Sequence, residues 1–258
     1  MKTLKTRIYL LALSFIAINT FAQDAAPAAE EKPKIVMSGY IDSYILTAFN
    51  SPKSLTLMGQ GQGDPNGING GFPAGRAFDR LDKQFALGLV QTKFAYSDKK
   101  SDLVIDLTFG PNAELGNFGN TGGLAGNTSG TTNLWRSSNP FVNQLYGSSA
   151  AIKQAYFTYK ATDKLSFTVG QFGTHIGYEV IDAPVNYHYS LSNLFNNGPF
   201  YHIGMKATYA FSDKVTWMAG LVNNWDNLVD NSAQKSFVTQ FYVKPVDGFN
   251  IYLNYIGG

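Results

Sequence analysis

The chain has 258 residues, a formal net charge of +2 and no cysteine, and 15% of its residues are charged while 14% are aromatic. The lack of cysteine excludes a small domain stapled by disulfides, thiolate metal sites and cysteine nucleophiles. Beyond the first 22 residues no stretch is long and apolar enough for a membrane helix, which needs about 20 such residues, so a helical membrane protein is excluded too.

The N-terminus, residues 1–22, has the features of a secretory signal peptide. Lys2, Lys5 and Arg7 precede an apolar run over residues 8–18, and small residues follow as far as Ala22. The apolar run is too short to span a bilayer, although a retained N-terminal anchor is the alternative. Cleavage after Ala22 changes the formal charge from +2 to −1, so the basic precursor gives no reason to expect a nucleic-acid partner.

Nine strand-like stretches follow a short Ala, Pro, Glu and Lys tract at residues 23–33, which we expect to be a flexible periplasmic leader. In each stretch apolar and polar residues alternate, and a period of two places successive side chains on opposite faces of a strand. The expected strands are residues 34–50, 84–97, 102–110, 151–160, 165–174, 200–211, 215–224, 235–244 and 249–256.

Long and short connections alternate between these strands. Four tight turns are expected at Asp98-Lys99, Asp163-Lys164, Asp213-Lys214 and Asp247-Gly248, and the other connections are long. This alternation is typical of an outer-membrane up-and-down barrel with its short turns in the periplasm, whereas a soluble sandwich mixes connection lengths at both ends.

The predicted fold is therefore all-β, a transmembrane antiparallel up-and-down β-barrel formed by residues 34–258. Bacterial barrels usually have an even number of strands, so nine strands predict a barrel domain that is partial, with the sequence as given incomplete at its C-terminus.

Aromatic residues gather beside the tight turns and predict an interfacial girdle, because tyrosine and tryptophan favour the membrane surface. The alternative is ordinary cross-strand aromatic pairing in a soluble sheet. We expect the facing pairs Tyr209 with Trp217, Phe211 with Val215, Tyr159 with Leu165, and Phe157 with Phe167. The predicted girdle residues are Tyr96, Tyr159, Tyr209 and Trp217.

The opposite face of the strands carries polar side chains, which are costly toward lipid and harmless in a water-filled lumen. The predicted pore-lining residues are Tyr40, Asp42, Tyr44, Lys93, Asp106, Lys160, Lys206, Asn250 and Asn254. Lys93 is expected opposite Asp106 if the turn closes between Ser97 and Asp102. The same phase also turns Phe85, Leu87 and Leu89 inward, which is unusual for a wet lumen.

Charged residues of both signs concentrate in two connections and could bias which solutes pass a pore mouth, although a solvated loop face is the plainer alternative. The predicted pore-mouth residues are Arg76, Asp79, Arg80, Asp82, Glu179 and Asp182.

The remaining motifs do not predict catalysis, a metal or a cofactor. The glycine run at 59–63 lacks the helix of a phosphate loop, and the calcium-like residues 64–67 lack the bidentate glutamate. His188 with Ser190 or Ser192 has no orienting group for nucleophilic catalysis. His202 is expected to hold a loop at the barrel rim.

Several segments resemble the outer-membrane family called putative beta-barrel porin-2, or OmpL-like porins. The segments that carry the resemblance are residues 38–42, 76–79, 170–181, 198–202 and 253–258. The resemblance implies a porin-like barrel in the outer membrane without enzyme activity, from a family with longer members, and it assigns no substrate or binding residues.

The function expected from these patterns is an outer-membrane porin that allows passive diffusion of small hydrophilic solutes. The alternative is a non-conducting structural or adhesive outer-membrane barrel, and a soluble sandwich ranks third. The expected partners are outer-membrane lipid and small hydrophilic solutes, without nucleic acid, and the sequence leaves open whether the protein forms a homo-oligomer.

Overall fold

The computed structural model describes residues 34–47, 78, 85–117, 149, 151–192, 194–195, 198–224, 226, 228 and 234–258. The predicted signal peptide and leader lie outside these residues, as do the glycine-rich motifs at 59–67. The predicted pore-mouth residues Arg76, Asp79, Arg80 and Asp82 also lie outside them.

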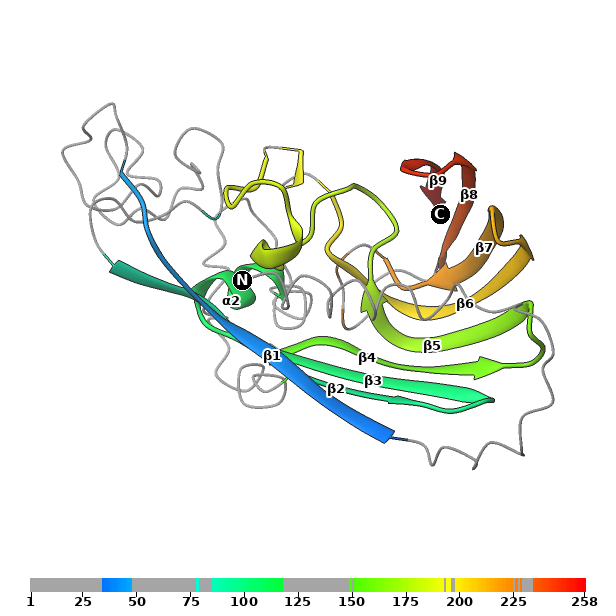
Figure 1. The fold of residues 1–258 in the computed structure, drawn as a ribbon, viewed down its shortest axis with the longest axis horizontal. Helices are drawn as coiled ribbons and strands as arrows, with labels where there is room; N and C mark the ends of the chain where they lie inside the picture. Colours follow the sequence, from blue (N-terminus) through cyan, green and yellow to red (C-terminus); the bar gives the residue numbers. More distant parts are fainter. Residues whose placement is uncertain are drawn as a thin grey trace, which may run out of the picture.

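Nine strands form one antiparallel sheet in which each strand pairs with its neighbours in sequence (Figure 1). The all-β prediction is confirmed, and the strand ends agree with the predicted ones within two residues, except that β1 ends at Ile45. The strands are β1 (Lys34–Ile45), β2 (Phe85–Ser97), β3 (Ser101–Phe109), β4 (Ile152–Lys160), β5 (Leu165–Gly173), β6 (Tyr201–Ser212), β7 (Val215–Val222), β8 (Ser236–Val246) and β9 (Phe249–Gly257).

In the described residues, short helical elements that the sequence pattern did not predict lie in two of the long connections. The helix α2 (Pro111–Gly116) follows β3 and begins with a proline. Proline is tolerated in the first helical turn because an N–H group there would have no partner within the helix. The 3₁₀ helix η3 (Ala183–Val185) lies between β5 and β6. No helix in the described part of the chain has the length and apolar character needed to cross a membrane.

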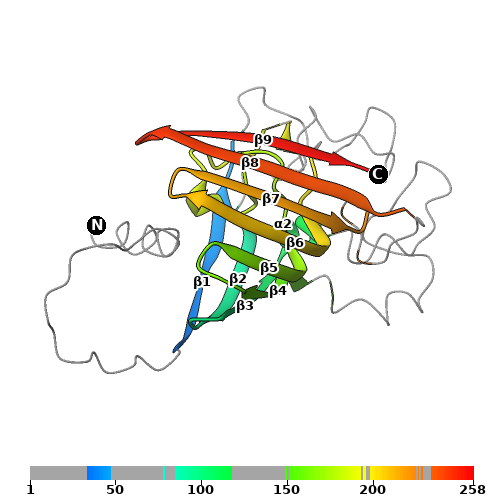
Figure 2. The same cartoon turned by 90° about the vertical axis from the view of Figure 1, so that its right-hand side faces the viewer.

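The sheet curves strongly, so that it has a convex and a concave face (Figures 1 and 2). The connection between β5 and β6 folds back over the concave face. In the described residues β1 pairs with β2 and β9 pairs with β8, so this part of the sheet is not closed.

The two faces differ in side-chain type because the strands alternate. On β3, Leu103 and Ile105 are 41% and 38% exposed on the convex face, whereas Val104 and Asp106 are 8% and 1% exposed on the concave face. On β1, the residues predicted to face outward are exposed, among them Ile35, Met37, Ile41 and Ile45. The convex face is therefore an exposed apolar surface, as a lipid-facing surface must be.

A β-bulge at Gly88 corrects the predicted orientation of β2. Asp42 pairs with Leu89 and Ser43 pairs with Leu87, so Gly88 is an extra residue on β2. Because cross-strand partners share a face, Leu89 lies inward with Asp42, and Phe85 and Leu87 lie outward. The prediction that Phe85 and Leu87 face inward was wrong, since strict alternation does not allow for a bulge.

The hairpin registers were predicted in part. Tyr209 pairs with Trp217, and Lys93 pairs with Asp106, as expected. Phe211 does not face Val215, because the register shifts there and Val215 pairs with Ser212.

The register predicted for the β4–β5 hairpin was wrong by two residues. Tyr159 pairs with Phe167 rather than with Leu165, and Phe157 pairs with Val169 rather than with Phe167. The connection is longer than a two-residue turn because the Thr162 hydroxyl oxygen accepts bonds from the backbone N–H groups of Lys164 and Leu165.

Candidate functional site

The β5–β6 segment, residues 174–200, is a folded element on the concave face of the sheet (Figure 1). It has a small apolar core in which buried Leu191 packs with Ile181, Phe195 and Phe200 around buried Phe78. The ring centroid of Phe78 lies 5.6 Å from that of Phe195 and 6.2 Å from that of Phe200. This core stabilises the fold of the segment, and other side chains attach the segment to the sheet.

Asp182 attaches the segment to three strands. Its Oδ1 accepts hydrogen bonds from the Tyr40 hydroxyl at 3.1 Å and from Gln91 Nε2 at 2.9 Å, and its Oδ2 forms an ion pair with Lys153 Nζ. Bonds to a charged acceptor contribute about 1.5–3 kcal/mol each. Asp182, predicted as a pore-mouth charge, therefore lies against residues of β1, β2 and β4, and its role in a pore stays a prediction.

Asp106 lies beside this contact and is almost fully buried, at 1% exposure. Its Oδ2 accepts a hydrogen bond from Gln91 Nε2 at 3.2 Å and lies 3.5 Å from Lys153 Nζ. Lys93 occupies the predicted position opposite Asp106, but the ion pair that the described residues give Asp106 is with Lys153. Gln91 and Lys153 thus connect Asp106 to Asp182.

Lys153 was not predicted to point inward because strict alternation along β4 assigns it to the outer face. Strict alternation would place it on the outer face with Phe157 and Tyr159. The register between β3 and β4 shifts at this point, where Gln154 pairs with Asp106 and Ile152 pairs with Leu107, and the bulged Lys153 turns toward Asp106. A lysine on a lipid-facing phase is costly, and that cost was the sequence signal for a bulge.

Further contacts attach the segment to the sheet near its two edge strands, β1 and β9. Near β1, the Tyr189 hydroxyl donates to Asp42 Oδ2 at 2.9 Å, and its ring lies 5.4 Å from that of Tyr44. Near β9, His175 Nε2 donates to the carbonyl oxygen of Tyr255 at 3.1 Å.

Burial lowers the pKa of the His175 imidazole, and the nearby Lys206 charge acts in the same direction. The β8 side chain of Gln240 donates to the carbonyl oxygen of His175 at 3.2 Å. The β5–β6 segment therefore has contacts from β1 to β9, across the whole width of the described sheet.

The other predicted pore-lining residues lie apart from the Asp182 contact. Lys160 Nζ forms an ion pair with Asp102 Oδ1 at 2.7 Å, close to the short turns. Lys206 Nζ lies 4.2 Å from the centre of the Phe172 ring. Asn254 and Asn250 accept hydrogen bonds from Gln240 and Tyr242, both at 2.8 Å. Their role as pore lining stays a prediction.

The four predicted girdle residues lie toward the short-turn end of the sheet. Tyr159, Tyr209 and Trp217 are exposed, and Trp217 Nε1 donates to Thr239 Oγ1 at 2.9 Å. The Tyr96 hydroxyl donates to Asp98 Oδ2 at 2.9 Å. These bonds hold the polar atoms while the rings stay accessible, which suits an interfacial position.

Glu179, Ser192 and His202 have structural partners. Glu179, another predicted pore-mouth residue, accepts hydrogen bonds from the backbone N–H and the hydroxyl of Ser192. His202 is fully buried and lies 3.1 Å from Thr174 Oγ1, where the segment begins. Within the described ranges no group of three or more His, Cys, Asp or Glu side chains could hold a metal ion.

An antiparallel meander with an apolar convex face, and with its buried polar and charged side chains on the concave face, defines a sheet of the membrane-barrel type. The chain belongs to the family described as Putative beta-barrel porin-2, OmpL-like, whose model matches residues 34–258. No curated protein and no solved structure matches the chain. Membership indicates a general porin-like role, implies the outer membrane, and places the chain in a family type that is generally non-enzymatic.

Proposed function

We propose that this protein is an outer-membrane porin through which small hydrophilic solutes diffuse passively, with the β5–β6 segment narrowing the path. The observation that carries the proposal is the set of contacts that attaches this segment to the concave face from β1 to β9. An element held at several points by ionic and hydrogen bonds keeps a fixed opening, which a size filter requires.

The charges at these contacts support a filter that responds to solute charge. Asp42, Asp106 and Asp182 lie near Lys93 and Lys153 at the place where the segment meets β1 to β4. Charged side chains in a constriction bias which ions pass, because the surrounding low dielectric screens them poorly. The mechanism needs no catalysis and no cofactor, only water in the path and these fixed charges.

A non-conducting structural barrel is the second candidate, and one observation favours it. Phe172, Met218, Val222 and Val238 form a buried apolar cluster, with Tyr156 and Ile256 packed against it. These residues lie on strands β4 to β9 and point toward the interior by alternation. Small barrels are filled by their own side chains, and an apolar interior of this kind would close a path to water.

Planar-bilayer recording of the protein purified from outer membranes separates the two candidates. The porin should give discrete current steps. Non-electrolytes small enough to enter the pore should lower the current, and those above a limiting size should leave it unchanged. A variant with residues 177–190 replaced by a short Gly-Ser linker should give a larger step. Insertion without current would favour the structural barrel.

The location is tested separately from conduction. We propose export through the signal peptide, so the mature protein should begin at Gln23 and fractionate with the outer membrane. It should also show heat-modifiable migration on gels. Recovery in the soluble periplasmic fraction would contradict the outer-membrane proposal whatever the current recordings give.

A further inference from the structure

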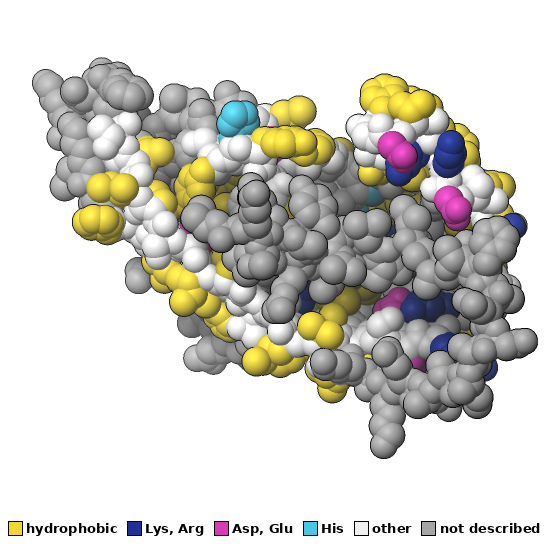
Figure 3. All heavy atoms as spheres, viewed as in Figure 1, with side chains coloured by type: hydrophobic (Ala, Val, Ile, Leu, Met, Phe, Trp, Pro, Cys, Tyr) yellow, Lys and Arg dark blue, Asp and Glu magenta, His cyan; other side chains and the backbone are white. Residues whose placement is uncertain are grey.

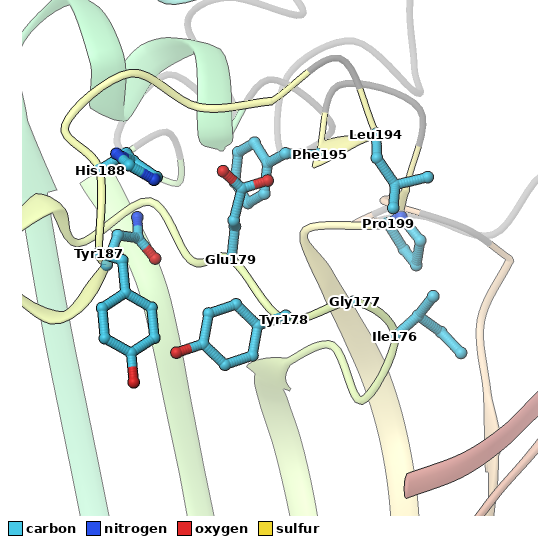
Figure 4. A pocket seen from close by; sticks show the side chains of 10 residues that line it. Ile176, Gly177, Tyr178, Glu179, Tyr187, His188, Leu194, Phe195 and Pro199 are labelled. Carbon is cyan, nitrogen blue, oxygen red and sulfur yellow. The ribbon is translucent and has the colours of Figure 1, made fainter.

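Two tyrosines of the β5–β6 segment form an exposed aromatic pair. The ring centroids of Tyr178 and Tyr187 are 6.0 Å apart and their planes differ by 9°. The rings lie side by side in Figure 4, and the residues are 70% and 87% exposed. Neither belongs to the apolar core around Phe78 and Leu191, so folding of the segment does not account for them.

A pocket of about 370 Å³ adjoins this pair. Its volume lies within the range of small-molecule sites, roughly 300–1000 Å³. Apolar walls come from Ile176, Leu194, Phe195 and Pro199, and polar atoms come from Glu179, Asn186 and His188 (Figure 4). Figure 3 shows a histidine side chain with hydrophobic side chains beside it on this face of the molecule.

Two polar groups of the pocket, those of Glu179 and Asn186, are held in place by their own contacts. Glu179 is fixed by the backbone N–H and hydroxyl of Ser192. Asn186 Oδ1 accepts from the Val180 N–H at 3.1 Å, and its Nδ2 donates to the Val180 carbonyl oxygen. Each carboxylate or amide oxygen has a second lone pair, so these groups can still accept from a ligand hydroxyl. A ligand would meet groups that lose little freedom on binding.

We propose that this pocket binds a saccharide ring of an oligosaccharide as it passes along the β5–β6 segment, an inference that rests on the proposed porin function. A pyranose has one face of C–H groups and a rim of hydroxyls. The C–H face suits the electron-rich face of a tyrosine ring, as the positive edge of one aromatic ring suits the face of another. The hydroxyl rim suits Glu179, Asn186 and His188. A purely aromatic solute would use the rings but not the three polar groups.

Binding is measured by isothermal titration on detergent-solubilised protein, with maltohexaose, cellohexaose and chitohexaose as probes. At least one hexasaccharide should bind, while polyethylene glycol of similar mass should not. In Tyr178→Ser/Tyr187→Ser the affinity should fall about tenfold or more. In Tyr178→Phe/Tyr187→Phe, which keeps both rings, it should stay close to that of the parent. Both residues are exposed, so the substitutions leave the segment's core intact.

The outcomes distinguish this inference from the porin proposal. Saccharide binding without current in bilayers would overturn the porin and keep the site. Current without binding of any of the three hexasaccharides would overturn the site and keep the porin. Binding that is unchanged in the serine variant, or binding of phenol in place of the saccharides, would also overturn the saccharide site.

Discussion

The convex and concave faces of this sheet are formed by the same strands, yet they differ in what each residue requires. On the convex face, Ile35, Met37 and Ile41 need only be apolar, because lipid accepts any apolar shape. On the concave face, Asp106 and Gln91 each depend on particular partners, several of which come from other strands or from the β5–β6 segment. The convex face therefore tolerates exchange among apolar residues, whereas Asp106 and Gln91 on the concave face tolerate only changes that keep their partners.

The largest effect is expected when charge is moved to the convex face. Ile41→Lys should lower the free energy of unfolding in lipid vesicles by about 2–4 kcal/mol, because a lysine there would lie in the bilayer interior. Urea titration followed by tryptophan fluorescence measures the loss. Asp42→Asn is the matched control, since it changes the neighbouring residue on the other face and should cost less. A harmless Ile41→Lys with a damaging Asp42→Asn would mean that the faces are inverted.

The next largest effect is expected at Asp182. Asp182→Asn removes the ion pair with Lys153 and weakens the bonds from Tyr40 and Gln91. The segment should then dock less tightly by about 1.5–3 kcal/mol, and its amide hydrogens should exchange faster. Asp163→Asn makes the same charge change in an exposed turn and should leave exchange unchanged. Equal amide exchange in the two variants would show that Asp182 does not anchor the segment.

A smaller effect is expected from acid. The pKa of His175 is lowered, mainly by burial, so the unfolded state takes up its proton first as the pH falls below about 6.5. Docking of the segment at His175 is therefore most stable above that pH and weakens below it, because burial disfavours the charged ring although the bond to the Tyr255 carbonyl oxygen favours it. The amide protection factors of the segment, which are exchange rates corrected for the slower intrinsic exchange in acid, should be lower at pH 5 than at pH 7.5.

The matched variant for the acid effect is His175→Gln. Glutamine can still donate to the Tyr255 carbonyl oxygen but does not titrate, so the difference between the two pH values should shrink. Buried His202 and the Lys206 cation lie close to the His175 ring. An undiminished difference in the glutamine variant would mean that His175 does not carry the effect.

The smallest change is spectroscopic. Trp217 lies on the convex face beside Tyr209, with its indole N–H bonded to Thr239. If it belongs to an interfacial girdle, quenchers attached to lipid headgroups should reduce its emission in Trp217 single-tryptophan protein more than quenchers at the acyl-chain ends. Aqueous acrylamide should quench it weakly. Quenching by acrylamide alone would place this ring in water and outside the girdle.

The sequence predicted what the period of two controls. Alternation located all nine strands and assigned Ile41 and Asp42 to opposite faces, because each residue's side follows from its neighbours alone. It failed at Gly88 and Lys153, where one extra residue reverses the phase. Glycine at Gly88 fits the bulge, since an added Cβ would overlap the Asp42 carboxylate and would lie 3.0 Å from Asn112 Nδ2. The local pattern gave no signal for the bulge at Gly88, whereas the lysine on the outward phase was a signal for the bulge at Lys153.

The contacts of the β5–β6 segment could not be predicted from the sequence, for a different reason. Asp182 is 91 residues from Gln91 and 142 from Tyr40, and such bonds follow from tertiary packing. The sequence did identify Glu179 and Asp182 as a charged pair after the fifth strand. It could not identify their partners, because the positions of Ser192 and Lys153 along the chain have no regular spacing from Glu179 and Asp182.

The assignment of the two faces is tested most directly by cysteine accessibility in the membrane. The chain has no cysteine, so each introduced thiol is unique. Ser166 pairs with Thr208 on the concave face, and Val169 pairs with Met205 on the convex face of the same two strands. With protein in lipid vesicles, a charged methanethiosulfonate reagent should modify cysteine at Ser166 and Thr208 and spare cysteine at Val169 and Met205. The reverse pattern, or equal modification at all four positions, would contradict a wet concave face and a lipid-covered convex one.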